Sequence, residues 1–99
     1  MRTPDRATVA VARVDFRIPL SRGLKDKRSV VKSFLQKARD RFGLATCESG
    51  YLDDCGLASL TLVAVSGQEQ RVRETLRSAV AFLEENYGVE VFQAVEEVF

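Results

Sequence analysis

The sequence predicts an α+β domain in which two helices cover one face of a four-stranded antiparallel sheet. Two segments carry apolar residues at the three- and four-residue spacing of a helix. Four other segments alternate or are rich in β-branched residues, as strands are. The order along the chain is strand, helix, strand, strand, helix, strand, and 99 residues are enough for one hydrophobic core.

The first strand is predicted over residues 8–20, where apolar and polar residues alternate. Pro19 ends it, because proline cannot donate to a strand ladder. The opposite phase begins with Val9 and Val11, so the start of this strand is apolar on both sides. The phase predicted to face the core comprises Ala10, Ala12, Val14, Phe16 and Ile18.

The first helix is predicted from an N-cap at Asp26 to about Phe42, with Gly43 as its stop. A short strand over residues 44–51 and a turn over residues 52–54 follow. Residues 57–65 form the strongest strand, which we expect at the centre of the sheet. The apolar stripe of the helix comprises Val30, Val31, Phe34, Leu35, Ala38 and Phe42.

The second helix is predicted to begin at a capping box in which Ser66 caps the helix and Glu69 reaches back. Gly88 is the natural left-handed residue at its end. A last strand over residues 89–98 completes two interlocked βαβ halves. We therefore expect a ferredoxin-like βαββαβ sandwich with the first and third strands central. Residues 1–99 form a single domain in this prediction, with residues 1–6 as a loose tail.

The block from Gly23 to Val31, GLKDKRSVV, resembles the S-L-K-x-K-R-x-V motif of the bacterial YlxP-like family, whose activity is not established. The similarity continues through Arg41-Phe42 and the two following strands. Gly23 replaces the usual Ser, and Cys55 stands near a frequent Trp. The resemblance implies a ferredoxin-like fold. It also suggests a link to RNA or the ribosome, because family members are often encoded near translation and ribosome-maturation genes.

Charge is divided unevenly along the chain. Residues 1–46 carry twelve basic and four acidic side chains (+8), and residues 47–99 carry three and ten (−7). Such asymmetry indicates a polyanion or a complementary partner, although charges on a helix often belong to an ordinary solvated face. We expect a non-enzymatic protein that contacts RNA or the ribosome. The candidate contact residues are Arg22, Lys25, Lys27, Arg28, Lys32 and Arg39.

Two alternatives remain open. An apolar outer sheet face indicates a protein–protein adaptor or a homodimer, unless the phase of one strand is misassigned. The residues predicted there are Val9, Val11, Val63 and Val65, with Val91 as a further candidate. The second alternative is an anion-binding enzyme that uses the backbone of Arg22-Gly23.

Other function classes have little support. The chain has no His, so imidazole catalysis and imidazole metal ligation are excluded, and we expect no catalytic site, metal or cofactor. No apolar run is long enough to span a membrane and the first residues do not resemble a secretion signal, so we expect a cytoplasmic protein. Cys47 and Cys55 are expected as buried thiols, although a cross-strand disulfide is possible. No aromatic residue occupies the strand over 57–65, which disfavours base stacking on the sheet.

Overall fold

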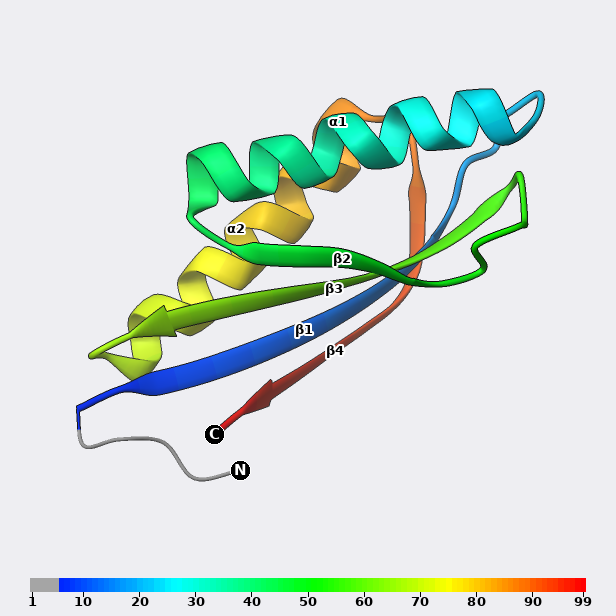
Figure 1. Cartoon of the computed structure of the whole chain (residues 1–99). Coiled ribbons are helices and arrows are strands. Elements are labelled where there is room, and N and C mark those ends of the chain that lie inside the picture. Colours follow the sequence, from blue (N-terminus) through cyan, green and yellow to red (C-terminus); the bar gives the residue numbers. More distant parts are fainter. Residues whose placement is uncertain (1–5) are drawn as a thin grey trace.

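The first and third strands form the centre of one four-stranded sheet, and both helices lie on the same face of it (Figure 1). The structure is a computed structural model that describes residues 6–99. Its strand order is β2-β3-β1-β4, so β2 and β4 are the edges. The elements are β1 (Thr8–Arg17), α1 (Leu24–Phe42), β2 (Ala45–Gly50), β3 (Leu57–Ser66), α2 (Glu69–Asn86) and β4 (Glu90–Val98).

This arrangement is the ferredoxin-like βαββαβ sandwich that the sequence predicts. β1 pairs antiparallel with β3 without interruption, from Thr8 opposite Ser66 to Arg17 opposite Leu57. On its other side β1 pairs antiparallel with β4, and that ladder has a bulge between Asp15 and Phe16. The central position of β3 is therefore confirmed, and it fits a strand that is apolar on nearly every residue.

The core lies between the sheet and the two helices. The predicted inward phase of β1 is confirmed, because Val14 and Phe16 are fully buried and Ile18 is nearly so. Leu60 and Leu62 of β3 are also fully buried. The remaining buried apolar residues are Ala10, Ala12, Val31, Phe34, Ala38, Leu44, Ala58, Ala64, Val72, Leu76, Ala79, Leu83 and Val89.

The predicted helix ends are confirmed at their C-termini. Gly43 adopts a left-handed conformation (φ 65°), and its N–H donates to the Arg39 carbonyl at 3.1 Å. The Leu44 N–H donates to the Ala38 carbonyl at 3.2 Å, which completes the usual helix-ending pair of hydrogen bonds. Gly88, just after α2, is also left-handed (φ 63°).

The predicted N-caps are wrong at both helices. α1 begins at Leu24 with Gly23 as its N-cap, so Asp26 lies inside the first turn and accepts the Arg22 N–H at 2.9 Å. α2 begins at Glu69 with Gln68 as its N-cap. Ser66 remains in the β3 ladder, and its hydroxyl accepts the Gln68 N–H at 3.2 Å instead of capping the helix.

Three further expectations concern the ends and the cysteines. The expected loose tail falls outside the described residues, apart from Arg6. Cys47 and Cys55 are free but exposed, so their expected burial is wrong. Cys47 lies on an edge strand opposite Thr61, and Cys55 lies in the β2–β3 loop. Within residues 6–99, neither helix has the length and apolarity that a membrane crossing requires.

Candidate functional site

One side of α1 presents four cations to solvent. We call these residues, Lys25, Arg28, Lys32 and Arg39, the basic row, and all four are exposed. They lie within about a 60° sector because their spacings of three, four and seven residues bring each back to the same side of a helix. At 1.5 Å per residue the row is about 21 Å long. The structure thus brings together four of the six residues predicted to contact RNA.

The basic row overhangs the β2 edge of the sheet. Arg39 Nη1 donates to Thr46 Oγ1 of β2 at 2.9 Å, which fixes the side of α1 that faces this edge. Figure 1 shows α1 lying above β2, with α2 crossing the same face of the sheet beside it. The row is therefore accessible along a helix and a free strand edge at once.

The cations of the basic row have no carboxylate partner among residues 6–99. The ion pairs in that part of the chain involve Arg13, Lys27, Arg73 and Arg77 instead. The carboxylate of the nearby Asp26 accepts a hydrogen bond from the Arg22 N–H at the start of the helix. Unpaired cations keep their charge and hydration available for an external anion, so the row is an electrostatic site without an internal counterion.

Lys27 does not belong to this site, which corrects the prediction. Its side chain is 1% exposed, its Nζ donates to the Tyr51 carbonyl, and it lies 3.1 Å from Glu48 Oε2. The residue falls on the buried side of α1 because it is four residues before Val31 and seven before Phe34, both of which are core residues. That spacing was visible in the sequence. The lysine thus joins α1 to the β2–β3 hairpin.

Arg22 lies beside the basic row, in the loop before α1, and its side chain is exposed. Its backbone N–H, which an anion-binding loop would offer to a phosphate, donates to Asp26 Oδ2. Ser21 Oγ bonds to the Gly23 and Cys55 carbonyls and ties this loop to the β2–β3 loop. The Asp26 carboxylate therefore already accepts from the Arg22 N–H, one of the backbone donors that an anion-binding enzyme would need in this loop.

The four valines predicted at an interface meet at one end of the outer sheet face. Val9 lies directly opposite Val65, and Val11 directly opposite Val63. Val65 is the most open, at 67% exposed. Val91 is not part of this face, because the β-bulge shifts it opposite Phe16 and it packs against the core.

Apart from Val95 of β4, which lies opposite Arg13, the outer face beside these valines is mainly polar. Arg13 Nε donates to Asp15 Oδ1 at 3.3 Å and to Ser59 Oγ at 3.1 Å. Thr61 Oγ1 bonds to Ser49 Oγ at 2.8 Å. Asp15 and Ser59 are buried within this group even though they lie on the side of the sheet that no helix covers. This face offers no aromatic platform on its two central strands.

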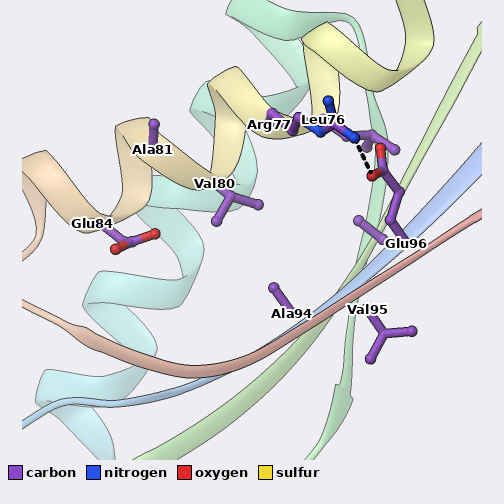
Figure 2. Close-up of a pocket in the computed structure, with 9 residues that line it drawn as sticks. Leu76, Arg77, Val80, Ala81, Glu84, Ala94, Val95 and Glu96 are labelled. Atoms are coloured by element: carbon purple, nitrogen blue, oxygen red, sulfur yellow. Dashed lines mark hydrogen bonds and ion pairs between the residues drawn. The ribbon is translucent and has the colours of Figure 1, made fainter.

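A groove between α2 and β4 is a feature that the sequence did not reveal (Figure 2). Its volume is about 300 Å³. Leu76, Val80, Ala81 and Ala94 form its apolar wall, and Arg77, Glu84 and Glu96 carry charge along it. Arg77 Nη2 lies 3.3 Å from Glu96 Oε2, as the dashed line in Figure 2 marks. The groove depends on how far α2 lies from the sheet edge, which periodicity does not encode.

Comparisons with known proteins bear on the fold and the family. No curated protein shows significant sequence similarity to the chain. The fold is similar to part of a VAO-type flavoprotein from Myceliophthora thermophila, with a TM-score of 0.59 and 14% identity. That match covers 94% of this chain but 16% of the flavoprotein, so it shows the fold alone. The sequence profile of the family described as protein of unknown function DUF503 matches residues 9–95, and the chain belongs to that family.

Proposed function

We propose that the protein is a non-enzymatic RNA-binding protein that contacts a phosphate backbone through the basic row of α1. The observation that carries this proposal is the row itself, four exposed cations without a carboxylate partner in residues 6–99. Salt-labile phosphate contacts of this kind give affinity without reading bases. Arg22, in the loop before the helix, extends the row by one cation.

The distribution of charge gives the proposed contact a direction. Glu90, Glu96 and Glu97 lie on β4, and Glu84 and Glu85 lie near the end of α2. β4 is the edge of the sheet opposite β2, over which the basic row hangs. A polyanion is therefore attracted to one edge of the molecule and repelled from the other. This arrangement favours an oriented complex over binding on all sides.

The residues on the outer sheet face favour recognition of the RNA phosphate backbone rather than of the RNA bases. Proteins that read RNA on a four-stranded sheet stack bases on aromatic side chains of the central strands. Here the outer positions of β1 and β3 carry valines, Arg13, Asp15, Ser59 and Thr61. The resemblance to the YlxP-like family favours ribosomal RNA as the partner, because of the genes that often accompany its members.

Co-sedimentation with ribosomal subunits tests the proposal. Purified protein is layered with subunits at low and at high salt, and each gradient fraction is probed for it. We expect the protein in a subunit fraction at low salt and free at high salt. Arg28→Glu with Lys32→Glu should leave it free at low salt as well. Its absence from every ribosomal fraction at low salt would contradict the proposal.

A matched variant controls for net charge. Lys37→Glu with Arg71→Glu makes the same change in charge on two exposed residues outside the basic row. We expect this variant to stay with the subunits at low salt. Equal release of both double variants would show that total charge, rather than the row, governs the association.

A protein contact at the valine end of the outer face is the second candidate function, favoured by the exposure of Val65. Burial of valines responds weakly to salt, whereas phosphate contacts weaken steeply. A partner retained at high salt by the wild type and by Arg28→Glu with Lys32→Glu, but lost on Val65→Asp, would support this candidate over RNA binding.

A further inference from the structure

The helix side of β4 is open, whereas the same side of its neighbour is covered. Val14 of β1 is 0% exposed, yet Ala94, directly opposite it on β4, is exposed. The reason is the placement of the helices, because α1 packs on β2 and α2 packs mainly on β1 and β3. β4 is also an edge strand, so its outer row of backbone groups has no partner strand in residues 6–99.

Apolar side chains gather along this open edge. The groove of about 300 Å³ lies between α2 and β4, walled by Leu76, Val80 and Ala94. Phe92 of β4 is 50% exposed, and Val95, which lies on the outer side of the strand opposite Arg13, is 45% exposed. A long apolar edge strand is a template for pairing with another strand unless charges or a covering element protect it. From Phe92 to Val95 this strand carries no charge.

On the groove side of α2 a positive side chain comes first and a negative one follows it. This side of the helix is therefore complementary in charge to an antiparallel copy of itself. Arg77, Ala81 and Glu84 are spaced four and three residues apart, and all three line the groove. In an antiparallel copy of the helix whose axis passes between Val80 and Ala81, Arg77 faces Glu84 of the second copy, and Val80 faces Ala81 of the second copy. Because α2 is set back over β1 and β3, the long side chains of Arg77 and Glu84, rather than the helix backbones, bridge the two copies.

We infer that this edge binds a second copy of the chain across a two-fold axis that passes near Ala81 and Ala94. Both residues line the same groove, so one axis serves the helix pair and the strand pair (Figure 2). The two β4 strands pair antiparallel, and the two sheets become one continuous sheet of eight strands. A two-fold axis requires a self-complementary surface, which the order of charges on α2 provides.

The strand pairing is compatible with the carboxylates of β4. With Ala94 opposite itself, Gln93 faces Val95 of the second copy, and Phe92 faces Glu96 of the second copy. No carboxylate faces another. Phe92 is also diagonal to Ala94 of the second copy, a separation that an aromatic side chain can span. Arg77 lies 3.3 Å from Glu96 of its own copy and, in the dimer, also contacts Glu84 of the second copy.

The dimer is independent of the proposed RNA contact. α1 lies over β2, at the sheet edge opposite β4. The two basic rows are therefore at the two far ends of the dimer, on the same face of the joined sheet, and remain free. A monomer would contradict the dimer without affecting the RNA proposal, and loss of RNA binding would leave the dimer standing.

Light scattering coupled to size-exclusion chromatography tests this inference on the full chain over a dilution series. We expect twice the chain mass of 11.0 kDa at high micromolar concentration. Glu84→Arg places two like charges together and should weaken the dimer about tenfold or more. Arg77→Glu combined with Glu84→Arg restores opposite charges and should recover the dimer, while Arg73 remains beside Glu96.

Two further variants decide between surfaces. Ala81→Arg adds bulk at the proposed axis and should give a monomer. Glu85→Arg makes the same charge change as Glu84→Arg on an exposed neighbour outside the groove, and should leave the dimer unchanged. Circular dichroism confirms that each variant is folded. A chain of 11.0 kDa at every concentration would overturn the inference. So would a dimer that responds equally to the Glu84 and Glu85 variants, or only to Val65→Asp.

Discussion

The ammonium group of Lys27 lies 3.1 Å from the carboxylate of Glu48, with the lysine side chain 1% exposed and the glutamate 24% exposed. The same ammonium donates to the carbonyl of Tyr51, a non-glycine residue held at a positive φ of 55°. One side chain of α1 thus anchors the end of β2 and the turn that follows it. This contact stabilises the fold. It is separate from the exposed cations Lys25 and Arg28, which flank Lys27 on the helix.

Removing this lysine should destabilise the protein. Lys27→Ala leaves the partly buried Glu48 without its cation and opens a cavity, so we expect the free energy of unfolding to fall by about 2–3 kcal/mol. Urea denaturation measures the change. Lys25→Ala, two residues earlier and exposed, should shift it by less than about 0.5 kcal/mol. Equal effects of the two variants would show that the buried pair makes no special contribution.

The two glycines that flank α1 should respond oppositely to serine. Gly23 is the N-cap in extended backbone, and a Cβ there meets nothing within 4 Å. Gly23→Ser supplies a hydroxyl to the first turn and should stabilise the protein by a few tenths of a kcal/mol. Gly43→Ser must adopt a φ of 65° and should cost about 1 kcal/mol. Thermal and urea unfolding of both variants check the signs, and a stabilised Gly43→Ser would be inconsistent with the observed cap.

Asp54 should make stability depend on pH in the acidic range. The backbone N–H groups of Gly56 and Leu57 both donate to Asp54 Oδ1 at 2.8 Å, and these bonds hold the pKa of Asp54 below its ordinary value of 3.8. Its stabilising effect is therefore complete above the unfolded pKa and disappears as the pH falls through the lower, folded pKa.

Comparing the wild type with Asp54→Asn isolates this effect. The difference in unfolding free energy should be constant near neutral pH and shrink below about pH 4. An NMR titration of the Asp54 side chain measures its pKa directly. A pKa at or above 3.8 would contradict the hydrogen bonding in the loop.

The sequence predicted those features that depend on periodicity along one element. The inward phase of β1, the apolar stripes of both helices and the positive φ at Gly43 and Gly88 all follow from local spacing and local backbone chemistry. The resulting order of elements was sufficient to predict the sheet topology. It also placed Lys25, Arg28, Lys32 and Arg39 on one side of α1.

Features that depend on contacts between elements were missed. The run of basic residues predicts Lys27 among the exposed cations although its spacing is that of the core, and its partners Glu48 and Tyr51 lie more than twenty residues away in the sequence. Val91 is a further candidate for the outer face from the alternation along its strand, but a β-bulge shifts the phase and places it opposite Phe16. The groove beside Ala94 results from the lateral position of α2, which no single segment encodes.

The salt dependence of RNA binding tests the central claim most directly. Fluorescence anisotropy with a labelled single-stranded RNA gives the affinity at several salt concentrations. Four phosphate contacts predict a slope of log affinity against log salt of about −3. Arg28→Glu with Lys32→Glu should lower the affinity at least about tenfold and roughly halve the slope, while Lys37→Glu with Arg71→Glu changes both much less. A slope near zero, or equal losses in the two double variants, would contradict an RNA contact through the basic row.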